Sequence, residues 1–240
     1  MRYPFVAAVL LALTVACASA QEVTLYLMEV PPYAMDAPQQ KGMVGDVVLE
    51  ALRRAGYQTR LVVVPSPRAL SAVPGMQDTL IIPLARTKDR ETHYTWIAHI
   101  LNVERAFFTL DRKVTSFAEA KAAFKSIGVA RASAGYPILL EQGFDADQIQ
   151  VLNQGVSAVR MLQSHRIDAW YNPVLEAELL QREAGVPSSF AMSPTLGPTE
   201  QYLGCSRKCD PKLVASLSAA IKAMQRDGTV QKMIAHYLAP

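Results

Sequence analysis

The sequence predicts an α/β protein with two lobes, each built on a mainly parallel sheet flanked by helices, and a cleft between the lobes. Strand-like and helix-like segments alternate along residues 22–102 and again along 126–194, which is typical of parallel sheets covered by helices on both faces. Two extended segments, 105–110 and 199–204, fit strands that cross between the lobes. We therefore assign 21–108 and 200–240 to the first lobe and 109–199 to the second.

The individual elements follow from apolar spacing and from the residues that end each segment. In the first stretch we expect strands at 23–28, 59–64 and 79–84, and helices at 44–55 and 69–73. In the second we expect strands at 127–130, 149–152 and 167–171, and helices that begin at 116 or span 134–142, 157–164 and 174–184. After the second crossing, helices are expected at 211–226 and 229–238.

The first twenty residues predict a secretory signal. Arg2 precedes an apolar run over 6–16, and Ala18-Ser19-Ala20 is a small-residue cleavage site. We therefore expect an exported protein whose residues 1–20 are removed. Lipid attachment at Cys17 is the alternative, but Thr14 stands where an aliphatic residue would be expected.

The composition bounds the class of partner. The 240-residue chain has a net charge of +3, and half of its residues are apolar. This charge is too balanced to indicate nucleic acid or a membrane surface as the partner, and the apolar content is enough for a sizeable core.

Polar and aromatic residues gather in the loops that follow the predicted strands. In α/β sheets, ligands bind at the carboxyl ends of the strands. Arginine forks and aromatic side chains at those ends suit a small anion with an apolar part. The candidate site residues are Glu29, Tyr33, Arg68, Ala85, Arg86, Arg90, Arg131, Ser133 and Asn172.

Six segments in chain order resemble the family 3 extracellular solute-binding proteins, the periplasmic components of polar amino-acid ABC transporters. They are EVPPY (29–33), GMVGDVVLEALRRAG (42–56), RTKDRETHYTWI (86–97), SIGVARASAGY (126–136), VRMLQSHRIDAW (159–170) and AMQRDGTVQKMIAHYL (223–238). The resemblance implies the two-lobed type II periplasmic binding protein fold. It also implies a monomer in the periplasm that binds a small carboxylate ligand, delivers it to a membrane ABC permease, and has no cofactor or catalytic residue.

The resemblance also assigns roles to single residues. The family's Thr-x-x-Arg arginine, which forks the ligand's α-carboxylate, falls on Arg90, and the second-lobe hydroxyl that contacts the same carboxylate falls on Ser133. Two positions depart from the family: Asn172 or Pro173 stands where an aspartate usually holds the ligand's ammonium group, and Ala85 replaces a hydroxyl residue.

These departures leave the ligand open. A basic pocket with Arg68 as a second cation suits a dicarboxylate, an acidic amino acid or another organic anion, whereas Glu29 would suit a cationic group. Simpler interpretations stay open as well. Arg86 fits a solvated arginine, Arg68 an exposed residue at a helix start, and Arg90 a surface ion pair with Asp89 or Glu91.

Two other functions use the same fold. A periplasmic ligand-sensing module for a membrane receptor has the same sequence features. A cyclic-acid dehydratase would need an acid such as Glu29 or Glu176. No nucleophile elbow, phosphate loop or metal-ligand spacing is present, and the four histidines share no pattern.

Cys205 and Cys209 are the cysteines that remain after signal cleavage. Their spacing allows the approach that a disulfide needs, and the periplasm is oxidising. We therefore predict that they form a disulfide.

Overall fold

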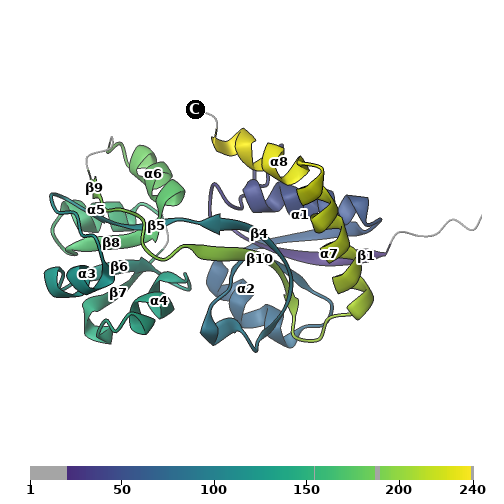
Figure 1. Ribbon diagram of the computed structural model, residues 1–240, viewed down its shortest axis with the longest axis horizontal. Coiled ribbons are helices and arrows are strands. Elements are labelled where there is room, and N and C mark those ends of the chain that lie inside the picture. Colours follow the sequence, from purple (N-terminus) through teal and green to yellow (C-terminus); the bar gives the residue numbers. More distant parts are fainter. Residues whose placement is uncertain (1–20, 154, 187–189, 239–240) are drawn as a thin grey trace, which may run out of the picture.

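Two lobes lie side by side in the computed structural model, which describes residues 21–153, 155–186 and 190–238 (Figure 1). Each lobe contains a five-stranded sheet, with strand order β2-β1-β3-β10-β4 in the first and β7-β6-β8-β5-β9 in the second. The predicted signal peptide and Cys17 lie outside the described residues. Among those residues, no helix is both long enough and apolar enough to span a bilayer.

The first lobe combines the start and the end of the chain. Its strands are β1 (Glu22–Met28), β2 (Gln58–Val64), β3 (Leu80–Ala85), β4 (Tyr94–Val103) and β10 (Thr199–Ser206). Its helices are α1 (Met43–Arg54), α2 (Ser66–Ala72), α7 (Pro211–Arg226) and α8 (Thr229–Leu238), with short 3-10 turns at Val73–Gly75 and Lys88–Arg90.

The second lobe is a continuous middle section of the chain. Its strands are β5 (Arg105–Thr109), β6 (Ile127–Ala130), β7 (Ile149–Leu152), β8 (Ala169–Pro173) and β9 (Ala191–Met192). Its helices are α3 (Phe117–Ala123), α4 (Gly135–Glu141), α5 (Ser157–Gln163) and α6 (Val174–Glu183), with a 3-10 turn at Ala146–Gln148.

Both sheets are mainly parallel, as predicted, with one reversed strand in each. Strand β1 pairs in parallel with β2 and β3, whereas β10 runs antiparallel to β3 and β4. The second sheet repeats this plan, because β6 is parallel to β7 and β8 while β5 is antiparallel to β8 and β9. The reversed strand of each sheet, β10 in the first and β5 in the second, follows a crossing between the lobes.

The chain crosses between the lobes at Glu104 and again before β10. Strand β5 pairs with β8 and so belongs to the second sheet. Residues 105–108, which the predicted division placed in the first lobe, therefore lie in the second. Figure 1 shows β4 and β10 side by side, extending from the first lobe toward the second. Strand β4 itself was not predicted, although its 10 residues make it the longest in the described chain.

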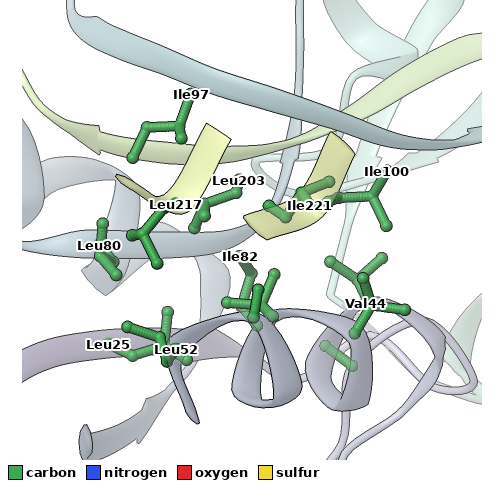
Figure 2. Packing of buried hydrophobic residues seen from close by; sticks show 14 of the residues in the cluster. Leu25, Val44, Leu52, Leu80, Ile82, Ile97, Ile100, Leu203, Leu217 and Ile221 are labelled. Carbon is green, nitrogen blue, oxygen red and sulfur yellow. The ribbon is translucent and has the colours of Figure 1, made fainter. Parts of the chain in front are cut away.

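Helices α1 and α7 pack on the first sheet and enclose its core, as Figure 2 shows. The spacing of apolar residues in α1 brings Val44, Val47, Val48, Ala51 and Leu52 to one buried face. The opposing sheet residues, among them Leu25, Leu80, Ile82 and Leu203, are fully buried. This core fixes the strand ends that carry the residues of the cavity between the lobes.

Cys205 and Cys209 form a disulfide with a Cα–Cα distance of 6.1 Å, as predicted. The bond joins the end of β10 to the turn before α7. It lies in the first lobe, and neither cysteine lines the cavity described below.

Candidate functional site

A cavity of about 60 Å³ lies between the lobes and is lined by residues of both. The first lobe contributes Met28, Val30, Tyr33, Ser66, Pro83, Ala85, Arg90, Val103 and Gln201. The second contributes Arg105, Ala130, Ala132, Ser133, Ala134, Pro173 and Glu176. One ordered water needs roughly 10–15 Å³ of cavity volume, so the cavity has room for several water molecules or a ligand of a few carbon atoms.

Tyr33 reaches the cavity because its loop is tied to the start of α1. The backbone nitrogen of Val44 donates to the carbonyl of Tyr33 at 2.8 Å. Gly42 has φ +86°, and a Cβ there would lie 2.7 Å from the backbone of Ala34, so only glycine allows this approach. Tyr33 is buried, and burial raises the pKa of its hydroxyl. A hydrogen bond from the backbone of Leu175, in the second lobe, acts in the opposite direction.

Arg90 ends the 3-10 turn that follows β3 and points into the cavity wall. It is 9% exposed, and its Nη2 donates across the cleft to the carbonyl oxygen of Ala132 at 2.9 Å. Nη1 makes a longer contact, 3.4 Å, to the carbonyl of Ala85. No carboxylate in the described chain lies within ion-pair distance of Arg90. Burial lowers the pKa of its guanidinium, an effect that Asp89 only partly opposes.

The ion pair expected as the simpler role of Arg90 belongs instead to Arg86. Arg86 Nη2 lies 2.5 Å from Glu91 Oε1, and its Nε donates to Oε2 at 2.9 Å. Its guanidinium also lies 5.3 Å from the ring centroids of Trp96 and Tyr202. Arg86 is exposed and does not line the inter-lobe cavity.

Ser133 faces Arg90 from the second lobe, in the turn between β6 and α4. The preceding residue, Ala132, has φ +61°, an uncommon conformation for a residue with a side chain. This conformation is part of the turn that presents the Ala132 carbonyl to Arg90. Ser133 Oγ accepts a hydrogen bond from the backbone nitrogen of Gly135 at 3.2 Å, which leaves its own hydrogen for another acceptor.

Glu176, in the first turn of α6, is the acid of the cavity. It is 7% exposed and accepts a hydrogen bond from Asn172 Nδ2 at 3.1 Å. Burial raises its pKa to about 7, against the opposing effect of Arg105. Asn172 is therefore close to the site through Glu176, and it is completely buried.

Five candidates of the sequence prediction do not line the cavity: Asn172, which is buried behind Glu176, and four exposed residues. Glu29, Arg68 and Arg131 are exposed, as is Arg86, and none of them is among the cavity-lining residues. Arg68 sits near the start of α2 and therefore does not supply the second cation of this cavity. The structure brings the other four candidates together at the cavity: Tyr33, Ala85, Arg90 and Ser133.

Arg105 is a charged residue of the cavity that the sequence prediction missed. It begins β5, is 3% exposed, and donates from Nε to Thr199 Oγ1 at 2.6 Å. A charged residue at the start of the apolar segment RAFFTL was the available signal. Gln201, which is also buried and lines the cavity, was missed because it lies on the returning strand β10.

Comparison with known proteins identifies the family. The model of the bacterial extracellular solute-binding proteins, family 3, matches residues 24–240. The chain belongs to this family. A search of curated protein sequences found no significant match.

Solved structures share the fold of this solute-binding protein at low sequence identity. A histidine kinase sensor domain with similarity to periplasmic binding proteins has a TM-score of 0.78 at 14% identity, covering 91% of this chain and 96% of that one. The ligand-binding core of GluR0 from Nostoc punctiforme, in complex with L-glutamate, has a TM-score of 0.74 at 15% identity, covering 92% and 100%. An ABC uptake transporter substrate-binding protein from Streptococcus pneumoniae, with bound histidine, has a TM-score of 0.73 at 16% identity, covering 90% and 92%.

The cavity is lined by charged and hydrogen-bonding groups. In the described part of the chain, no group of three or more histidine, cysteine, aspartate or glutamate side chains is arranged to hold a metal ion. The buried polar groups are two guanidiniums, one carboxyl group and several hydroxyl and amide groups. Guanidinium, hydroxyl and amide groups are donors that suit hydrogen bonds to an anion.

Proposed function

We propose that this protein captures a small solute with a carboxylate group between its lobes in the periplasm and delivers it to the permease of an ABC transporter. The fold and the family support binding of a solute. The carboxylate specificity rests on Arg90, and the delivery step rests on the structural similarity to an ABC uptake transporter substrate-binding protein.

The observation that carries the proposal is the unpaired state of Arg90. A guanidinium has five N–H donors, and Arg90 makes one good hydrogen bond, to Ala132, and one long one. Burying a charge without a partner is unfavourable. A ligand carboxylate in the cavity would accept two parallel hydrogen bonds from Arg90 and a third from Ser133.

Closure of the lobes around the ligand follows from the same contacts. Arg90 and Ser133 come from different lobes and line one cavity. A ligand that touches both is bound better when the lobes are closed, so it shifts the population toward the closed state. The closed complex is then the form that a permease recognises.

Sensing is an alternative function that would use the same closure. The structural similarity to a histidine kinase sensor domain supports this alternative. Genes for a permease and an ATPase next to this one would support transport. A gene for a membrane receptor in their place would support sensing.

An enzymatic role has one observation in its favour, the buried acid Glu176 with a pKa of about 7. Such a pKa suits a general acid near neutral pH. Incubation with a prephenate-like cyclic acid tests this directly. We expect binding or no effect, and formation of an aromatic product would replace the transport proposal with a dehydratase.

A thermal-shift screen of amino acids and organic acids, followed by small-angle scattering, tests the proposed function. A true ligand raises the unfolding temperature by mass action, and we expect it to reduce the radius of gyration as well. Arg90→Ala should abolish both effects. A ligand that binds tightly without any compaction would contradict capture by closure.

A further inference from the structure

Arg105 places a second buried guanidinium in the inter-lobe cavity. It stands at the first position of β5, immediately after the chain crosses at Glu104. Its side chain is 3% exposed and lines the cavity together with Arg90. Two buried arginines in one small cavity are unusual, because buried arginines are nearly always paired.

The contacts of Arg105 use only part of its hydrogen-bonding capacity. Nε donates to Thr199 Oγ1 at 2.6 Å, and the guanidinium carbon lies 6.0 Å from the ring centroid of Tyr171. Nη1 is buried and has no hydrogen-bond partner among the residues that the structure describes. A buried donor of a charged group that stays unsatisfied is costly, so this nitrogen points to an acceptor that a ligand supplies.

The charges around Arg105 favour an anionic acceptor. Neither Arg105 nor Arg90 has a carboxylate within 4.0 Å in the described chain. The two guanidiniums are near enough for the charge of Arg105 to lower the pKa of Arg90. Glu176 is the acid that lines the cavity, and its hydrogen bond goes to Asn172 rather than to an arginine. The cavity therefore has an excess of positive charge.

We propose that Arg105 binds a second carboxylate of the ligand, so that the solute is a small dicarboxylic acid held by Arg90 and Ser133 at one end and by Arg105 at the other. This inference rests on the proposed function and narrows its ligand class. Glu176 then has a defined part. In its ionised form Glu176 accepts a hydrogen bond from the ammonium group of an acidic amino acid. In its protonated form it adds no negative charge, so the cavity can hold a dicarboxylate that has no ammonium group.

Matched ligands test the proposal on the wild-type protein. Calorimetry would compare succinate with butyrate, and glutarate with valerate, each pair having the same chain length and differing in one carboxylate. Aspartate and glutamate would be compared with asparagine and glutamine. We expect at least about 30-fold tighter binding of the diacid in at least one of these sets, since leaving a buried charge unpaired typically weakens binding by this factor or more.

Variants then assign the preference to Arg105. Arg105→Gln should reduce the preference for the diacid to within a few-fold, whereas Arg86→Gln, which removes the same charge outside the cavity, should leave it unchanged. Arg105→Lys keeps the charge and should retain part of the preference, so the test survives if the glutamine variant does not fold.

The outcomes separate this inference from the proposed function. Equal binding of mono- and diacids, or a preference that persists in Arg105→Gln, would overturn the role of Arg105. A ligand that depends on Arg90 but has a single carboxylate would overturn the dicarboxylate class and leave the proposed function standing. Binding that is independent of Arg90 would contradict the proposed function itself.

Discussion

Arg86 and Arg90 have the same side chain and lie four residues apart, yet they occupy opposite environments. Arg86 is exposed, forms a two-pronged ion pair with Glu91 and lies over the rings of Trp96 and Tyr202. Arg90 is buried in the inter-lobe cavity and contacts carbonyl oxygens. One guanidinium already has its carboxylate, and the other does not.

The two arginines differ in their partners rather than in residue type, and we propose that Arg90, which has no carboxylate partner in the described chain, binds the ligand. The 3-10 turn Lys88–Arg90 follows β3 and brings Arg90 to the cavity, whereas Arg86 stays outside it at the surface. At Arg86 the chain itself supplies the carboxylate, that of Glu91. A carboxylate supplied by a ligand would close the lobes at Arg90.

Truncating Arg90 should have the largest effect on this comparison. Arg90→Ala would leave the ligand carboxylate desolvated and unpaired, which should weaken binding by roughly 3–5 kcal/mol. Arg90→Lys should also bind poorly, because an ammonium group does not reproduce two parallel hydrogen bonds. Calorimetry with a ligand from the thermal-shift screen measures both. Binding by Arg90→Ala within a few-fold of wild type would remove Arg90 from the site.

The ligand-free protein provides the control for that experiment. Because burial already disfavours the charged form of Arg90, replacing it with methionine should leave the unfolding temperature unchanged or raise it. A large fall in the unfolding temperature of Arg90→Met would show that Arg90 has mainly a structural role.

Glu176 should make stability depend on pH in the opposite sense to an exposed, ion-paired acid. Its pKa is raised from 4.5 to about 7 in the fold, so its contribution is fully present below about pH 4.5 and is lost as the pH rises through 7. The loss should be on the order of 3 kcal/mol. Urea unfolding between pH 4.5 and 8 would measure it against Glu176→Gln. A wild-type curve parallel to that of the variant would contradict the assignment.

The disulfide tests whether stability and binding are separate in the first lobe. Cys205 and Cys209 close a loop with a sequence separation of 4, for which the chain-entropy model gives about 2 kcal/mol of stability. A Cys205→Ser/Cys209→Ser variant should unfold at a lower urea concentration and bind its ligand with unchanged affinity. Intact mass with alkylation before and after reduction would confirm the bond. A large loss of affinity would show that the bond positions the cavity.

Arg86 should give the smallest effect of all. It lies at the surface with its ion-pair partner and does not line the cavity, and exposed pairs contribute little. Arg86→Ala should bind the ligand within about threefold of wild type. A loss as large as that of Arg90→Ala would mean that the surface around Arg86 takes part in binding.

Much of the fold was predictable because apolar periodicity records which face of each element is buried. The helix α1 and the strands β1, β2 and β3 were all expected close to their observed bounds. Strand β4 was missed because its burial alternates irregularly, and its register with β10 shifts twice. The division of the lobes at 108 differs from the observed crossing at Glu104, since pairing of β5 with β8 is a long-range contact that no local pattern records.

The position of a residue at the cavity was predictable where the residue lies in a loop that follows a strand. It was not predictable where the residue lies at a crossing between the lobes. Arg90 and Ser133 belong to loops at strand ends and reached the cavity as expected. Arg68 has a similar position in the sequence, but its side chain is exposed near the start of α2. Arg105 was missed because its hydrogen-bond partner, Thr199, lies 94 positions away in the sequence.

A crystal structure with a ligand from the screen tests the central claim most directly. We expect a ligand carboxylate within hydrogen-bond distance of both terminal nitrogens of Arg90 and of Ser133 Oγ, while Arg86 keeps its ion pair with Glu91. A ligand whose carboxylate lies away from Arg90, with the hydrogen bond from Arg90 to Ala132 still intact as the main contact of that guanidinium, would contradict the account.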